Sequence, residues 1–179
     1  MARTALIGAV VTLAAAFVAA VGGTIGITNI WPVLLAVAVG LAGGVVTLGR
    51  IGAFVIGTLA AWIALALGAG ALPQTPLAAA LAVLVGVGIV AALAALTRDI
   101  APLWAGLAGY AAFTGYYTPL YEANPTLFLS ESPVALVTVL LAGGIGLTIA
   151  ALAEVVAPAQ RATQDHHEPP AMLVEDGTR

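Results

Sequence analysis

Aromatic and hydroxyl-bearing side chains recur at intervals of three or four residues between positions 110 and 121. They are Tyr110, Phe113, Thr114, Tyr117 and Tyr121. On a helix this spacing places them along one face, and Glu122 follows them directly. A solute-selective pore or binding pocket uses such a row of rings and hydroxyl groups beside an acidic mouth. A second interpretation stays open, because Tyr is also typical of the aromatic belt at a membrane surface and of helix packing.

The other groups capable of chemistry are few and poorly placed for catalysis. Both histidines, His166 and His167, lie in an acidic C-terminal segment, and the chain has no Cys. A Ser–His pair or a zinc site within the apolar part of the chain is therefore excluded. We expect no catalytic residues, no metal and no cofactor, and we do not expect an enzyme.

Glu154 is the single acidic residue inside an apolar stretch, near the end of that stretch. We expect it to extend to the membrane interface or to pair there with Arg50 or Arg98; a role in proton relay is the alternative interpretation. Ion-coupled transport usually needs ionisable groups inside the membrane. Their scarcity here favours passage of a neutral or weakly polar solute, or no transport at all.

The composition identifies the kind of molecule that must position these residues. Of the 179 residues, 62% are hydrophobic and 7% are charged, which is too few polar side chains to cover a soluble domain. The five basic residues are all Arg and are scattered, so a nucleic-acid interface is excluded. The sequence therefore predicts an integral membrane protein in contact with the lipid bilayer.

The apolar runs lack the alternation of barrel strands and are each near the ~20 residues that a helix needs to cross a bilayer. We predict an all-α protein with six transmembrane helices, at Thr4–Gly23, Trp31–Leu48, Ile51–Gly70, Leu77–Leu96, Ile100–Tyr117 and Val134–Val156. The longest predicted loop is Thr118–Pro133. Residues 1–156 form one transmembrane domain, and residues 157–179 are predicted to be a disordered acidic cytoplasmic tail.

Charge placement orients the six helices. With the N-terminus inside, every basic residue falls on the cytoplasmic side: Arg3, Arg50, Arg98, Arg161 and Arg179. The outer loops then carry Glu122 and Glu131. This distribution satisfies the positive-inside rule and predicts a multi-pass protein of the cell membrane with both termini in the cytoplasm.

Six spans divide into two groups of three with opposite orientation. The second span begins Ile30-Trp31-Pro32 and the fifth begins Ile100-Ala101-Pro102. This similarity is consistent with a 3+3 inverted repeat, an arrangement that places the solute path of many transporters at the repeat interface. It is also consistent with the common occurrence of Pro at helix starts.

Small residues are spaced as in closely packed membrane helices. The predicted helix-packing positions are Gly22, Gly26, Gly40, Gly43, Gly44, Gly143, Gly144 and Gly146. The second span, with three of them within five residues, is the best candidate for tight contact. One of these stripes could instead dock another copy of the chain or a partner subunit.

Three functions fit these features. The first is a small channel or facilitator, lined by the fifth span and its repeat counterpart and expected to form a homo-oligomer. The second follows from a resemblance: size, six-helix layout, internal termini and Ala15-xxx-Ala19 on the first helix resemble the vitamin-binding subunits of energy-coupling-factor transporters. No substrate motif accompanies this resemblance, so no site residue is carried over. The third is a non-transporting accessory or assembly protein.

Overall fold

The computed structural model describes residues 2–27, 29–42, 46–73 and 75–157, and its regular structure in these ranges is entirely helical. The elements are α1 (Ala2–Val21), η1 (Gly22–Ile25), α2 (Trp31–Leu41), α3 (Leu48–Gly70), α4 (Pro76–Leu96), α5 (Leu103–Ala123), η2 (Pro125–Leu127) and α6 (Phe128–Val156). The predicted all-helical fold is confirmed for this part of the chain. From residue 158 onward, the predicted tail lies outside the described residues.

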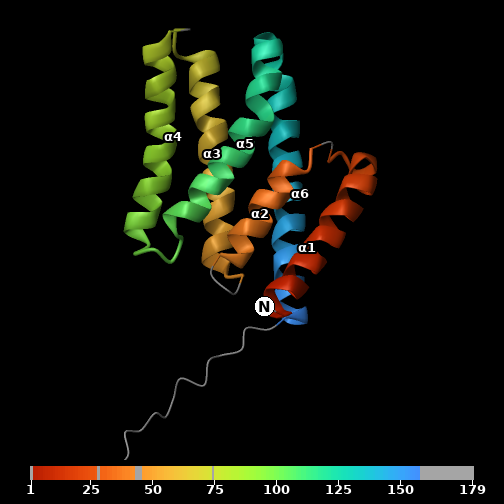
Figure 1. The fold of residues 1–179 in the computed structure, drawn as a ribbon. Helices are drawn as coiled ribbons and strands as arrows, with labels where there is room; N and C mark the ends of the chain where they lie inside the picture. The colour runs from red at the N-terminus through yellow and green to blue at the C-terminus, as the bar shows by residue number, and fades with distance from the viewer. Residues whose placement is uncertain (1, 28, 43–45, 74, 158–179) are drawn as a thin grey trace, which may run out of the picture.

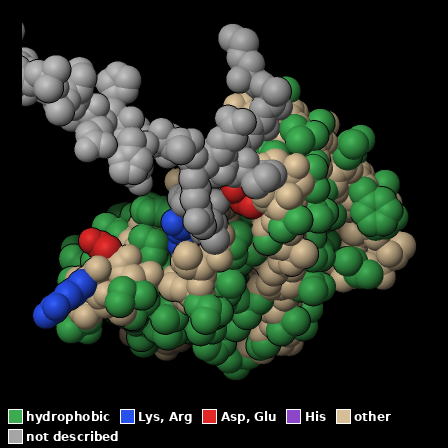
Figure 2. Space-filling model, turned by 90° about the horizontal axis from the view of Figure 1, so that it is seen from below, with side chains coloured by type: hydrophobic (Ala, Val, Ile, Leu, Met, Phe, Trp, Pro, Cys, Tyr) green, Lys and Arg blue, Asp and Glu red, His purple; other side chains and the backbone are tan. Residues whose placement is uncertain are grey.

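The helices run alternately up and down, so that α1 and α3 begin, and α4 and α6 end, at the same end of the bundle (Figure 1). Arg50 lies in the first turn of α3, Arg98 and Asp99 follow α4, and Glu154 precedes the end of α6. We call this the arginine end. Seen from this side, charged side chains sit among mostly hydrophobic ones (Figure 2). The opposite, glutamate end holds Glu122 and Glu131.

The predicted loop at Thr118–Pro133 is wrong, because most of it is helical. α5 continues to Ala123, η2 follows Asn124, and α6 begins at Phe128. Aromatic contacts hold this tight hairpin: the Phe128 ring packs edge-on against Tyr117 at 5.8 Å and Tyr121 at 5.9 Å between ring centroids. The Pro, Glu, Ser and Asn content of this segment suggested a loop, but Pro119 and Pro133 are both accommodated inside helices.

The boundary between the second and third helices also differs from the prediction. α2 ends at Leu41 rather than Leu48, and α3 begins at Leu48. Gly49 and Arg50, which the prediction placed between the two helices, therefore lie inside α3. Thr47 is the N-cap of α3, and its side chain accepts a hydrogen bond from the Arg50 amide at 3.4 Å. A capping threonine satisfies an amide that the helix itself leaves unpaired, which sets the start of α3.

Four described segments are long and apolar enough to cross a membrane: Thr4–Ile25, Leu48–Gly70, Pro76–Leu96 and Pro125–Val156. α2 is too short at 11 residues. α5 has 21 residues but carries Tyr and Thr along its length and is not among the four. Four helices thus meet the criterion of length and composition, where six were predicted.

α3 packs most extensively against α5, and glycines make this contact possible. A Cβ at Gly57 would overlap the carbonyl oxygen of Gly106, and a Cβ at Gly109 would overlap the carbonyl oxygen of Phe54. Thr58 is fully buried beside them, and its hydroxyl lies 2.9 Å from the Phe54 carbonyl oxygen and 3.2 Å from that of Gly109. Backbone therefore meets backbone along this interface, as small residues allow in membrane helices.

A second close pair, α2 with α6, uses predicted packing positions. A Cβ at Gly40 would overlap the Ala150 side chain, and one at Gly146 would overlap the carbonyl oxygen of Val33. Gly143 receives the Phe54 ring of α3, at 2.5 Å from an added Cβ. Because Gly40 is in contact with the chain's own α6, this glycine serves packing within one molecule.

The remaining predicted packing glycines differ among themselves. Gly22 lies against Ile27 in the turn after α1, and Gly26 in the same turn has a positive φ of 84°, which favours glycine. An added Cβ at Gly144 meets nothing within 4 Å. Gly43 and Gly44 lie outside the described residues.

Candidate functional site

A pocket of about 570 Å³ lies between α3, α4 and α5 toward the glutamate end. Its lining residues come from the second half of α3, the connection that follows it, the first half of α4, and α5 from Tyr110 onward. Three of the predicted solute-path residues line it: Tyr110, Thr114 and Tyr121. The helical spacing thus brought three hydroxyl-bearing side chains of α5 to one cavity.

The other predicted solute-path residues point elsewhere. Phe113 and Tyr117 are fully buried in the core, where their rings stack at 5.6 Å between centroids. Glu122 is exposed near the end of α5 and is not part of the lining. An α-helix rotates by about 100° per residue, so side chains three or four positions apart are offset from one another around the helix axis. The predicted stripe therefore covers two adjoining directions, one toward the core and one toward the pocket.

Thr118 and Thr75 also line the pocket, and sequence reasoning missed both. Thr118 follows Thr114 by one helical turn, so extending the fifth helix beyond Tyr117 would have placed it on the same face. Thr75 is the N-cap of α4, where its side chain accepts a hydrogen bond from the Ala78 amide at 3.3 Å. This residue comes from a different part of the chain, and no local pattern connects it with α5.

Tyr110 forms the floor of the pocket. An added Cβ at Gly86 of α4 would lie 2.6 Å from the Tyr110 ring and 2.9 Å from the Ala64 side chain of α3. The ring therefore fills the space that Gly86 leaves between the helices. One turn below, Val90 packs against Gly106, at 2.5 Å from an added Cβ. Together these contacts close the pocket toward the arginine end.

The chemistry of the lining is that of neutral hydroxyl groups on apolar walls. No charged side chain is found among the described lining residues, and α4 contributes Ala78, Ala79, Ala82 and Val83. The Thr114 hydroxyl donates to the Tyr110 carbonyl oxygen at 3.0 Å, so toward a ligand its oxygen is an acceptor. Such a surface can orient an uncharged molecule through a few hydrogen bonds while burying its apolar part.

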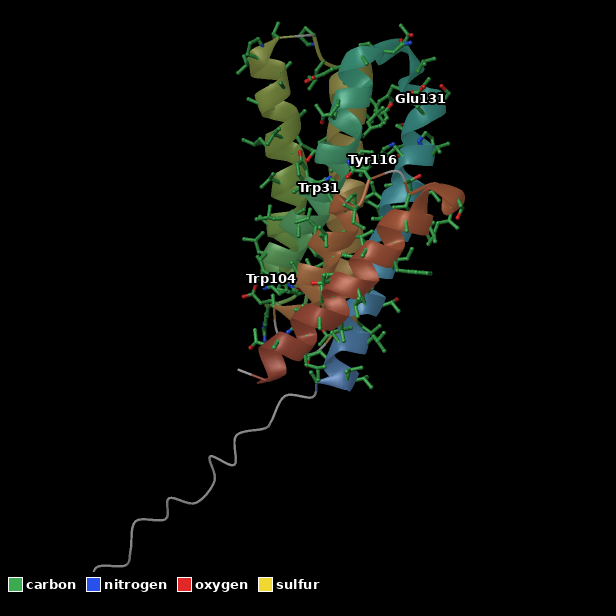
Figure 3. All side chains as sticks on the ribbon, turned by 45° about the vertical axis from the view of Figure 1, so that its right-hand side comes forward. Trp31, Trp104, Tyr116 and Glu131 are labelled. Carbon is green, nitrogen blue, oxygen red and sulfur yellow. The ribbon has the colours of Figure 1, made fainter. Side chains whose placement is uncertain are left out.

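The three residues of the predicted interfacial ion pair, Arg50, Arg98 and Glu154, lie at the arginine end, away from the pocket. The Arg50 guanidinium lies 5.8 Å from the centre of the Trp104 ring, within cation–π range. Arg98 is exposed, and Glu154 is half-buried on α6. Figure 3 shows Trp104 toward this end, Glu131 toward the opposite end, and Trp31 and Tyr116 between them.

Within the described residues no three His, Cys, Asp or Glu side chains gather as a metal site would require, and His166 and His167 lie outside them.

Comparison with known proteins gives no match. No protein-family model, no curated protein and no solved structure has a significant similarity to this chain.

Proposed function

We propose that this protein is a facilitator for a small neutral or weakly polar solute, located in the cell membrane, with the pocket between α3, α4 and α5 as the solute site. The observation that carries the proposal is the lining of that pocket, in which Tyr110, Thr114, Thr118, Tyr121 and Thr75 place hydroxyl groups on otherwise apolar walls. The floor at Tyr110 favours a gated binding site over an open pore.

The lack of charge in the described lining supports a neutral solute. A charged solute would lose its hydration on entry and would find no counter-charge among these residues, and an unpaired buried charge is costly. Hydroxyl groups compensate the loss of water for alcohol, carbonyl or amide groups. The proposed solute is therefore uncharged and carries one or a few such groups.

Helix packing supports the proposal of a 3+3 inverted repeat. α3 packs most extensively against α5, and α2 does so against α6. In a 3+3 repeat α1 corresponds to α4, α2 to α5 and α3 to α6. Replacing α3 and α5 by their counterparts gives α6 and α2, which is the second pair. The peripheral helices follow the same exchange, since α4 packs mainly on α3 and α1 mainly on α6. Inverted repeats support alternating access in transporters, in which a site closed at one end later opens there.

The proposed orientation places the arginine end in the cytoplasm. Arg50 and Arg98 lie at this end, as does the start of α1, whereas Glu122 and Glu131 lie at the other. The positive-inside rule then gives cytoplasmic termini and a pocket in the outer half of the membrane.

Transport by reconstituted protein tests the proposal. Liposomes containing the protein should take up at least one member of a panel of uncharged solutes, from glycerol to octanediol, faster than empty liposomes. Tyr110→Phe, which keeps the ring at the floor and removes its hydroxyl group, and Thr114→Ala should each slow this uptake several-fold. Thr138→Ala is the matched control, because the Thr138 hydroxyl also donates to a carbonyl one turn earlier but lies on α6, outside the lining. Wild-type rates in both pocket variants would exclude the pocket as the solute path.

A second proposal is a solute-binding subunit of a larger transporter, with α1 as the docking helix. Ala16, Ala19 and Ala20 of α1 are exposed, as a helix that packs against a partner subunit requires. Native mass spectrometry in a mild detergent distinguishes the proposals, because it reports a homo-oligomer, a partner subunit and a retained ligand separately.

A further inference from the structure

The three helices around the pocket do not close it equally on all sides. α3 packs along both α4 and α5 and forms the back wall. The close contacts of α4 with α5 at Gly86–Tyr110 and Val90–Gly106 lie below the pocket. Above them the two helices stand apart at the glutamate end (Figure 1), and their residues line opposite sides of the cavity. Ala79 and Val83 of α4 line the pocket and are exposed, so the seam between α4 and α5 is an open side of the pocket.

The surface around this seam is apolar. Val83 lines the pocket and is 51% exposed, and on the same helix Leu77 and Leu84 are 72% and 67% exposed. α4 is one of the four helices apolar enough to cross a membrane. A helix with exposed leucines and valines of this kind faces hydrocarbon chains, so the seam opens toward the bilayer.

The two walls of the pocket differ in chemistry along most of its height. On the α5 side, hydroxyl groups rise in steps of one helical turn, from Tyr110 at the floor through Thr114 and Thr118 to Tyr121. On the α4 side the wall is apolar from Pro76 to Val83, and its one hydroxyl group is that of Thr75 at the start of the helix. An occupant that matches both walls has an apolar body and uncharged groups that form hydrogen bonds along one edge.

We propose that the pocket takes its ligand sideways from the bilayer, through the seam between α4 and α5, and that this ligand is an uncharged amphiphile dissolved in the membrane. The inference rests on the proposed function of the pocket and adds its ligand class and entry route. An ionised headgroup is excluded from the class because the described lining has no charge to pair with it. A long-chain alcohol is the simplest member of the class.

The entry route is testable by electron paramagnetic resonance, since the natural chain has no Cys. A spin label on Thr114→Cys in nanodiscs should relax strongly with oxygen, which dissolves in the bilayer, and weakly with a water-soluble nickel chelate. Leu84→Cys is the lipid-facing control and Glu122→Cys is the control at the aqueous end. Preferential relaxation of the Thr114→Cys label by the nickel chelate would overturn lateral entry, and the proposed pocket function would stand.

The ligand class is tested by native mass spectrometry with three probes: dodecanol, dodecanoate at neutral pH, and glycerol. One dodecanol per chain should bind, at least roughly tenfold more tightly than dodecanoate. Ala79→Trp, at an exposed position of the lining, should abolish this binding, whereas Leu84→Trp on the lipid face of the same helix should not. Binding of glycerol without dodecanol would overturn the amphiphile and retain a solute pocket. Binding of none of the three would overturn both proposals.

Discussion

At the scale of single residues, the absence of one methyl group decides how close two helices can come. Gly57 and Gly52 lie on the same helix, but an added Cβ at Gly57 would overlap the Gly106 carbonyl oxygen, whereas one at Gly52 meets nothing within 4 Å. Overpacking a close interface typically costs about 1–3 kcal/mol. Gly57→Ala should therefore lower the thermal stability in detergent, and Gly52→Ala should leave it unchanged or slightly raised. Equal stability of the two variants would contradict this packing.

Trp62 and Ser132 form a polar contact between α3 and α6. The indole nitrogen donates to the Ser132 hydroxyl oxygen at 3.0 Å, and Ser132 is almost fully buried. Interhelical hydrogen bonds in membrane proteins contribute about 0.6 kcal/mol on average and up to ~1.7. A double-mutant cycle with Trp62→Phe and Ser132→Ala, measured by reversible unfolding, should give a coupling energy in this range. Additive effects of the two substitutions would mean that the hydrogen bond contributes nothing.

The candidate site shows how far residue spacing alone could go. The spacing placed Tyr110, Thr114 and Tyr121 on one face of the helix, where all three line the pocket, because helical geometry is fixed locally. It could not separate them from Phe113 and Tyr117, since the choice between core and pocket depends on which neighbouring helix each side chain meets. The opposite wall, from Thr75 to Val83, depends entirely on the packing of α4 against α3.

At the scale of elements, α5 combines two functions along its length. Its first half packs backbone to backbone against α3 through Gly106 and Gly109. Its second half contains Pro119 and carries the upper part of the pocket wall, and Figure 1 shows the helix changing direction between the two parts. Proline inside a helix is a common cause of such a bend, because it removes a backbone hydrogen bond.

The exchange of helix pairs between the two halves leads to a prediction at this scale. Gly146 of α6 approaches the Val33 carbonyl oxygen near the start of α2, as Gly57 of α3 approaches the Gly106 carbonyl oxygen near the start of α5. If the halves are equivalent, Gly146→Ala should destabilise the protein about as much as Gly57→Ala, by roughly 1–3 kcal/mol. Gly144→Ala is the control, because its Cβ would meet open space. A neutral Gly146→Ala would count against equivalent packing in the two halves.

At the scale of the whole molecule, the charges lie at the two ends of the bundle and the pocket lies nearer one of them. The natural chain contains no Cys, so single cysteines report the orientation directly. In intact cells, a membrane-impermeant maleimide should label Glu122→Cys, which is exposed at the glutamate end, and should label Arg98→Cys only after the cells are opened. Labelling of Arg98→Cys in intact cells would reverse the proposed topology.

The sequence by itself determined the chemical class of the molecule and most of its helices. With 62% hydrophobic residues and 7% charged ones, burial in lipid and helical backbone pairing are the stable outcome, whatever the tertiary contacts. The tertiary structure decided the helical continuation through residues 118–133, the close pairing of α3 with α5, and the second wall of the pocket. These depend on contacts between residues distant in sequence, such as Tyr117 with Phe128 or Tyr110 with Gly86, whose energies no local pattern contains.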